Sequence, residues 1–214
     1  MLKKERFLKL IDYFTENMPV AETELVYTDP YELLVAVILS AQCTDKRVNM
    51  ITPGFYKKYP DVFTLSKAKQ EDVFKLISSC SYPNNKTKHL IGMAQMLVKD
   101  FKGIVPSDLE SLQKLPVVGR KTANVMYSVA FGKQALAVDT HVFRVAARIG
   151  LTTGSKTPLE TEKQLVRYFP EKKLGIAHHW LILHGRYVCT ARNPHCSACG
   201  ISQWCKYYSN LKKG

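Results

Sequence analysis

Apolar positions recur every three or four residues along most of this chain, which is the spacing of one face of an α-helix. Near the N-terminus such a stripe comprises Phe7, Leu10, Ile11 and Phe14. A second stripe, closed by a glycine, comprises Leu90, Met93, Ala94, Leu97, Phe101 and Gly103. A third, which ends before Gly150, comprises Val142, Phe143, Val145, Ala146 and Ile149. No segment alternates as a half-buried strand does, so the pattern predicts an all-α fold.

Helix boundaries are marked by capping residues and by proline. Asp29 followed by Pro30 is typical of a helix start. The run 31–41 that follows is apolar on all sides, which predicts a helix in the middle of a core. A last long helix is expected from about Glu171 to Tyr187.

Two further helix starts carry the capping-box pattern, in which a serine or threonine precedes a glutamate by three positions. Ser107 with Glu110 forms one pair, and Thr157 with Glu160 forms the other. We therefore expect Ser107 and Thr157 to cap the helices that follow them.

The charge balance indicates which class of partner this helical protein binds. The 214 residues include 31 Lys and Arg against 18 Asp and Glu, a net charge of +13, which favours a nucleic-acid partner. An anionic membrane surface, a ribosome or a merely basic enzyme would also fit the charge. The longest apolar run, 33–39, is far shorter than the ~20 residues of a membrane span. Because the N-terminus also lacks a signal-peptide pattern, we expect a cytoplasmic protein without a membrane partner.

Four of the six cysteines cluster near the C-terminus. The pattern Cys-x6-Cys-x2-Cys-x5-Cys is formed by Cys189, Cys196, Cys199 and Cys205. Four thiolates suit an iron–sulfur cluster or a zinc ion, and zinc modules usually bring two closely spaced pairs. The spacing thus favours iron–sulfur, with zinc and unliganded thiols left open. Cys43 and Cys80 lie far away in apolar surroundings, and we expect them to be ordinary buried cysteines.

The most informative stretch is LPVVGRKTANVM, residues 115–126. It predicts a short turn containing Gly119 and a new helix from about Arg120, whose N-terminus could bind a phosphate. Lys121 lies in the first turn of that helix. The helix dipole and Arg120 should raise the neutral, nucleophilic fraction of its amine. The residues alone nevertheless favour a phosphate-binding lysine over a nucleophile that forms a Schiff base.

A second candidate lies eighteen residues later, in AVDTHVFRVAARIG. Asp139 opens the predicted helix there, where a carboxylate is a good N-cap. The same carboxylate could stabilise a cationic sugar or manage protons for the lysine. The pattern alone does not separate these two roles.

Four separated segments together resemble endonuclease III, of the helix–hairpin–helix glycosylase superfamily. They are LLVAVILSAQCTD, LPVVGRKTANV, VDTHVFR and the cysteine pattern, in the family's order. The resemblance spans nearly the whole chain, and the combination is far more specific than a lone hairpin.

The resemblance implies two all-helical lobes, with DNA and the active site at the cleft between them. One lobe is a six-helix barrel at about residues 22–133, with the helix–hairpin–helix at about 108–131. The other lobe joins residues 1–21 to 134–214. It holds a 4Fe-4S cluster on the four cysteines of the loop 189–205, which favours iron–sulfur over zinc.

The resemblance also assigns roles to single residues. Lys121 takes the position of the catalytic lysine and Asp139 that of the catalytic aspartate. The target nucleotide is flipped out in this family, and Gln42 matches the glutamine that fills the gap. A local alignment places Tyr82 where the family has an apolar wedge; the alternative is that Tyr82 packs on its own lobe.

The remaining expected DNA contacts involve backbone and cationic groups. Gly119 and Arg120 belong to the hairpin that binds DNA in the family. His141 and Arg144 should give support or contact phosphate, without taking part in the chemistry. Arg192, inside the cysteine loop, is a further candidate for a phosphate contact.

One position departs from the family pattern. Family hairpins usually read Leu-Pro-Gly-Val-Gly, and here Val117 replaces the first glycine. Either the turn has relaxed to negative φ at Val117, or a strained positive φ is tolerated.

The resemblance implies a bifunctional DNA glycosylase and abasic-site lyase that acts, as a monomer, on duplex DNA containing damaged pyrimidines or abasic sites. It removes oxidised pyrimidines and cuts the strand 3′ to the abasic site by β-elimination. One rival is a monofunctional mismatch glycosylase for adenine or thymine, in which the lysine position usually holds another residue. Another is a non-catalytic iron–sulfur protein that binds DNA or carries electrons.

Overall fold

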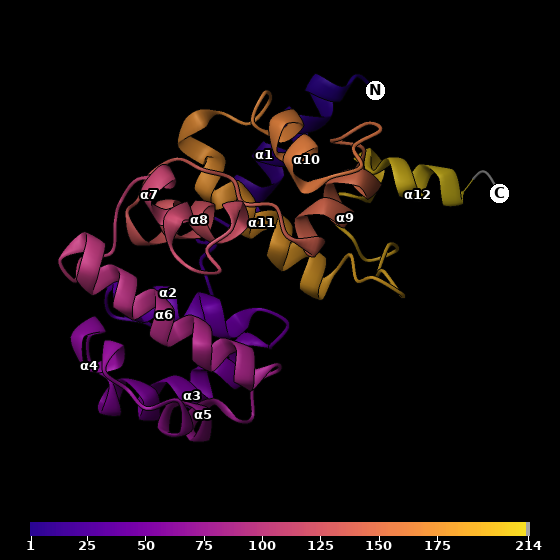
Figure 1. Ribbon diagram of the computed structural model, residues 1–214. Helices are drawn as coiled ribbons and strands as arrows, with labels where there is room; N and C mark the ends of the chain where they lie inside the picture. The colour runs from indigo at the N-terminus through magenta and orange to yellow at the C-terminus, as the bar shows by residue number, and fades with distance from the viewer. Residues whose placement is uncertain (213–214) are drawn as a thin grey trace. The chain divides into compact units, whose positions relative to one another are not determined.

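The computed structural model describes residues 1–212, and every regular element within that range is helical (Figure 1). The prediction of an all-α fold is confirmed. In chain order the elements are α1 (Lys3–Asn17), α2 (Pro30–Ser40), α3 (Asp45–Lys58), α4 (Val62–Ser66), α5 (Gln70–Ile77), α6 (Pro83–Phe101), α7 (Leu109–Lys114), α8 (Arg120–Val125), the π-helix η1 (Met126–Ala130), α9 (Thr140–Ile149), α10 (Pro158–Leu165), the 3₁₀-helix η2 (Glu171–Lys173), α11 (Leu174–Tyr187), the 3₁₀-helix η3 (Ser202–Trp204) and α12 (Lys206–Leu211). None of the described helices is long and apolar enough to cross a membrane.

The chain forms two compact units. The continuous unit is Thr23–Lys133. The discontinuous unit joins Met1–Glu22 to the segment from Gln134 onward, so that α1 belongs with α9 to α12.

Helix α2 lies at the centre of the continuous unit. Asp29 caps it, because its Oδ1 accepts the backbone N–H of Glu32 at 2.9 Å, and Pro30 occupies the first turn. Its side chains from Tyr31 to Leu39 are buried except that of Glu32. The apolar run therefore forms the core helix predicted for it, in contact with α3, α6 and η1.

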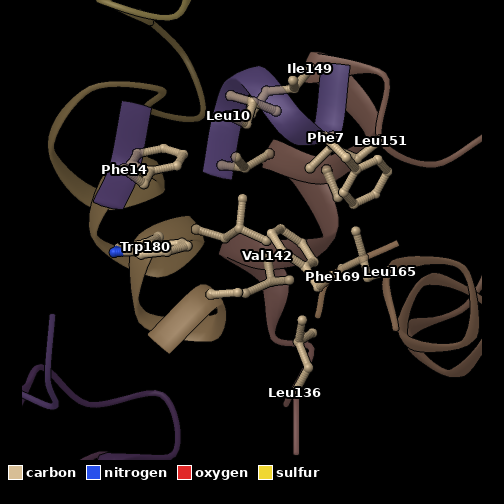
Figure 2. Packing of buried hydrophobic residues seen from close by; sticks show 14 of the residues in the cluster. Phe7, Leu10, Phe14, Leu136, Val142, Ile149, Leu151, Leu165, Phe169 and Trp180 are labelled. Carbon is tan, nitrogen blue, oxygen red and sulfur yellow. The ribbon is translucent and has the colours of Figure 1, made fainter. Parts of the chain in front are cut away.

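Helix α1 is held in the discontinuous unit by aromatic packing (Figure 2). The rings of Phe14 and Trp180 stack with centroids 5.7 Å apart and planes at 16°. The indole N–H of Trp180 also donates to the carbonyl of Met18 at 2.8 Å. Because both rings are almost completely buried, truncating either to alanine should cost about 3–5 kcal/mol of stability.

The capping predictions were correct at one site and wrong at the other. Thr157 caps α10, since its Oγ1 accepts the N–H of Glu160 at 3.2 Å. The carboxylate of Glu160 accepts from the N–H of Lys156 instead of closing the box. Ser107 is not the cap of α7: Asp108, the next residue, accepts the N–H of Ser111 at 2.8 Å. An aspartate is at least as good a cap as a serine, so the helix begins one residue later.

The predicted helix ends agree with the structure, except that the last long helix begins as a 3₁₀-helix. Gly103 follows α6 at φ +81° and Gly150 follows α9 at φ +89°, the left-handed conformation that glycine favours. The long helix expected from Glu171 to Tyr187 begins as the 3₁₀ turn η2 and continues as α11.

Candidate functional site

The hairpin between α7 and α8 is a tight turn with a valine in a strained position. The N–H of Val118 donates to the carbonyl of Leu115 at 3.1 Å, which closes a four-residue turn around Pro116 and Val117. Val117 has φ +58°, and proline followed by positive φ is the signature of a type II turn. The turn has therefore not relaxed to negative φ. A β-branched side chain takes the place where glycine is usual.

Helix α8 presents its first turn outward. Gly119 is its N-cap, and no atom lies within 4 Å of the position that a Cβ would take there. Arg120 and Lys121 follow, and both are exposed. Val118, in contrast, is buried and anchors the turn on the continuous unit. The helix continues directly into η1, so one uninterrupted helical segment carries the lysine.

Asp139 occupies the N-cap of α9 in the discontinuous unit. Its side chain is half-buried, and Oδ1 accepts the N–H of Val142 at 2.8 Å. The segment before it, residues 135–138, is buried. The capping role expected for Asp139 is confirmed, and the bond fixes the carboxylate at the start of the helix.

Arg144 holds neighbouring backbone in place. Its guanidinium donates to the carbonyl of Gly185 at 2.9 Å and to that of Cys189 at 3.1 Å through Nη2, and again to Cys189 at 3.3 Å through Nε. The same Nη2 lies 3.3 Å from Nδ1 of His141. These contacts attach α9 to the end of α11 and to the first cysteine of the cluster pattern. They give Arg144 the supporting role, while a phosphate contact by either residue stays a prediction.

The four clustered cysteines line one cavity. Its wall includes Cys189, Cys196, Cys199 and Cys205. Apolar groups of Ile149, Val188 and Ile201 complete much of the wall. Thiols that surround one shared space can act together as ligands of a single metal centre.

Four thiolates on one cavity wall can hold a 4Fe-4S cluster, in which the cysteines bind the iron atoms. Four thiolates can also bind one zinc ion, so the ligand set alone does not separate the two kinds of metal centre.

Arg148 is a contact of the cysteine loop that sequence reasoning missed. Its guanidinium donates to the carbonyls of Thr190 and Ala191 at 2.6 and 2.7 Å, and lies 3.6 Å from Sγ of Cys189. The guanidinium also lies 4.9 Å from the ring centre of Tyr207, a cation–π distance. Its position four residues after Arg144, on the same face of α9, was the available signal.

Burial shapes the electrostatics of the cavity. Desolvation raises the pKa of the Cys199 and Cys196 thiols, with the other cysteines adding to the effect. Desolvation also lowers the pKa of His184 to about 4, and its Nε2 lies 3.8 Å from Sγ of Cys199. Without a metal the cavity thus favours neutral groups, so metal binding there must displace thiol protons.

Gln42 and Tyr82 lie on two neighbouring loops of the continuous unit. Both are exposed, and both have left-handed backbone, with φ +55° and +56°. The hydroxyl of Ser81 donates to the carbonyl of Gln42 at 2.6 Å and so connects the loops. Tyr82 is 63% exposed, so most of its surface is open to solvent.

Comparisons with known proteins give the class. Residues 35–171 match the family of HhH-GPD superfamily base excision DNA repair proteins, and residues 189–205 match the iron–sulfur binding domain of endonuclease III. The helical hairpin and the cysteine loop thus place the chain among base excision repair proteins that carry an iron–sulfur centre.

Individual relatives narrow this class. Endonuclease III of Rickettsia conorii is 47% identical over 204 residues, which cover 95% of this chain and 97% of the relative. A solved trapped endonuclease III–DNA covalent intermediate matches with a TM-score of 0.94 and 40% identity, covering 99% of this chain and 100% of that one. A thermostable thymine-DNA glycosylase matches with a TM-score of 0.85 and 26% identity, covering 97% of each chain. The chain belongs to the endonuclease III family of base excision repair glycosylase/lyases, and its cofactor is a 4Fe-4S cluster.

Proposed function

We propose that this chain removes oxidised pyrimidines from duplex DNA and cleaves the resulting abasic site, with Lys121 as the nucleophile. The observation that carries the proposal is the position of Lys121, exposed in the first turn of the helix that follows the hairpin. An amine at a helix N-terminus is disfavoured as a cation, which favours the neutral form that attacks carbon.

The chemistry follows from an amine next to a deoxyribose. Once the damaged base is flipped out of the duplex, the Lys121 amine attacks the anomeric carbon, and the base leaves with the bonding electron pair. Ring opening gives a Schiff base between the lysine and the sugar. Loss of a proton from the adjacent carbon then expels the 3′ phosphate, which is β-elimination. Water releases the lysine, so no external oxidant or reductant is needed.

Asp139 is the second proposed catalytic residue. The capping bond to the N–H of Val142 fixes the orientation of its carboxylate. A fixed carboxylate stabilises positive charge that develops on the sugar. It can also accept or donate a proton during the reaction.

Gln42 and Tyr82 are the proposed gap-filling residues. Both side chains are exposed and stand on strained loop positions, and strain of this kind is often kept at ligand-binding sites. The aromatic ring of Tyr82 can stack on a base, while the Gln42 amide can donate to and accept from the orphaned partner base.

The four cysteines of the cavity are the proposed ligands of the 4Fe-4S cluster. When bound, the cluster cross-links the loop 189–205, because metal binding and local folding are coupled. Arg144 and Arg148 hold the same loop from α9 through backbone carbonyls. Arg192, exposed within the loop, is the proposed contact for a DNA phosphate.

We assign residues 22–133 to the barrel lobe and residues 1–21 with 134–214 to the cluster lobe of a monomeric enzyme. The contact-based units, divided after Glu22 and Lys133, support this assignment. A monofunctional thymine glycosylase is the second candidate, supported by the structural match at 26% identity. Lys121 argues against it, because the family resemblance puts another residue at that position in the monofunctional branches.

The test is covalent trapping on duplex DNA that contains an abasic site. Borohydride reduces the Schiff base, so the native enzyme should give a stable enzyme–DNA adduct. Lys121→Gln should abolish the adduct while it leaves binding of lesion DNA largely intact. Lys114→Gln, the same change at the end of α7, should trap normally. Robust trapping by Lys121→Gln would show that another group is the nucleophile.

A further inference from the structure

Two cysteines outside the cluster loop approach each other on the loops that carry the proposed gap-filling residues. Sγ of Cys43, in the loop between α2 and α3, lies 3.8 Å from Sγ of Cys80, in the loop between α5 and α6. Gln42 directly precedes the first cysteine, and Tyr82 follows the second by two positions. The pair therefore stands where the two loops meet, beside the hydrogen bond from Ser81 to Gln42.

The two thiols differ in access. Cys80 is 4% exposed, but Cys43 is only half-buried. The expectation that both are ordinary buried cysteines was thus wrong for Cys43, because Cys43 lies in a partly exposed loop after the end of α2. Both are free thiols, and at 3.8 Å their sulfurs are in van der Waals contact.

A buried cation lies close to the pair. Lys86, at 4% exposure, donates from Nζ to the carbonyl of Leu39 at 2.7 Å, at the end of α2. Burial raises the pKa of the Cys80 thiol to about 11, and the charges of Lys86 and Arg47 oppose that rise. Cys80 is therefore a poor first nucleophile, whereas Cys43 is the thiol that a reagent can reach.

We propose that Cys43 and Cys80 form a reversible disulfide, made by exchange with a low-molecular-weight disulfide, that cross-links the loops of Gln42 and Tyr82 and weakens lesion binding. Disulfides inside the cytosol are rare and are usually transient or regulatory, and this pair fits the second description. The effect on lesion binding, but not the disulfide itself, rests on the proposed gap-filling function.

The exchange balances without any other reactant. The Cys43 thiolate attacks one sulfur of the small disulfide, which forms a mixed disulfide and releases one small thiolate. The Cys80 sulfur then attacks Sγ of Cys43 and releases the second thiolate. The two cysteines are oxidised by two electrons, the small disulfide is reduced to two thiols, and the two cysteine protons pass to them.

Closing the bond ties the two loops together through their cysteine side chains. The sulfurs have to approach from 3.8 Å to about 2.05 Å in the disulfide. Gln42 and Tyr82 flank the moving cysteines and already have left-handed backbone, so they cannot absorb the shift at no cost. The oxidised protein should hold both side chains in positions that do not suit the gap in the duplex.

The first measurement detects the bond in the intact, cluster-loaded protein. Anaerobic incubation with oxidised glutathione, followed by non-reducing peptide mapping, should give a peptide that links Cys43 to Cys80. A reductant should remove the link. Cys43→Ser should give no linked peptide, and Cys80→Ser should stop at the glutathione adduct of Cys43. The absence of a linked peptide in the native protein would overturn the proposal.

The second measurement follows affinity for a duplex with a tetrahydrofuran abasic-site analogue. Oxidation should weaken this binding about tenfold, equivalent to about 1.4 kcal/mol, and a reductant should restore it. The cluster's visible absorbance and the affinity for lesion-free duplex should stay unchanged. Cys43→Ser should bind equally well before and after oxidation.

The outcomes distinguish the two proposals. A disulfide that forms without changing lesion affinity overturns the link to lesion binding. If oxidation weakens lesion binding equally in Cys43→Ser, the effect comes from other thiols, and the proposed link to lesion binding is overturned as well. If the reduced native enzyme gives no borohydride adduct, the proposed function fails, whatever the peptide map shows.

Discussion

Nδ1 of His178 lies 2.8 Å from the carbonyl oxygen of Ala137, two residues before Asp139. Both partners are buried, at 2% and 1% exposure. A carbonyl oxygen only accepts, so Nδ1 must be the donor of this bond. The bond connects α11 to the segment that delivers the proposed catalytic carboxylate.

His178→Phe should destabilise the fold by about 1–3 kcal/mol, because it leaves a buried carbonyl without this donor. It should also slow base excision in the fraction that stays folded, since the Asp139 segment loses its anchor. His178→Gln, which can still donate, should recover part of both losses. Denaturant unfolding and single-turnover excision measure the two effects separately. Full excision activity in folded His178→Phe would contradict a positioning role.

Asp139→Asn should keep the fold and slow excision about 10²–10⁴-fold, the usual range for the loss of an acid–base group. Asparagine caps a helix as well as aspartate does, so the bond to Val142 survives while the charge is lost. Asp108→Asn makes the same change at the cap of α7 and should excise normally. Single-turnover rates measure excision, and thermal unfolding measures whether the fold is kept. Unchanged excision by Asp139→Asn reduces the residue to a cap.

Val117→Gly should stabilise the protein by about 1 kcal/mol. A non-glycine residue at positive φ costs about 1–3 kcal/mol, and the extra chain entropy of glycine returns about 0.5–1 kcal/mol of that gain. Lyase activity should be intact. The variant should bind lesion-free duplex at least as tightly as the parent protein does, because the Gly119 backbone remains exposed.

The measurements for Val117→Gly are denaturant unfolding and a salt titration of affinity for lesion-free duplex. Lys102→Gly is the matched control, since Lys102 has φ +56° at the end of α6. It should raise stability without changing DNA affinity. A folded Val117→Gly variant that loses most of its affinity shows that the valine is itself an adapted DNA contact.

Arg192→Gln should lower the slope of log affinity against log salt by about one unit, as expected when one phosphate contact is lost. Arg167→Gln removes the same charge from an exposed site outside the cysteine loop and should change the slope less. Titrations of both variants on one lesion-free duplex provide the comparison. Equal slopes for Arg192→Gln and the parent exclude the contact.

Local sequence signals predicted most of the fold. The stripe from Phe7 to Phe14, the Asp29 cap and the glycine after α9 are local features, and each corresponds to an observed element. Ser107 was chosen as a cap because Ser-x-x-Glu is a frequent pattern. The adjacent Asp108 competes for the same role, and only the chain's path into α7 decides between them.

Contacts between distant segments could not be predicted in this way. Cys43 and Cys80 are 37 residues apart, and nothing in either neighbourhood indicates that two loops meet there. The engagement of Arg144 with the carbonyl of Cys189 likewise depends on how α9 packs on α11. The strain at Val117 was a different case, because the turn sequence left both signs of φ open and the structure has the positive one.

The discontinuous unit also sets an order of events during synthesis on the ribosome. Helix α1 leaves the exit tunnel before its packing partners, because the indole that donates to Met18 belongs to a residue 162 positions later. At about 5–20 residues per second, that residue follows roughly 8–32 seconds afterwards. During that interval the apolar face of α1 stays uncovered, while the continuous unit emerges whole and can fold. The nascent chain therefore exposes Phe7 and Phe14 throughout that interval, and a chaperone can bind these side chains during it.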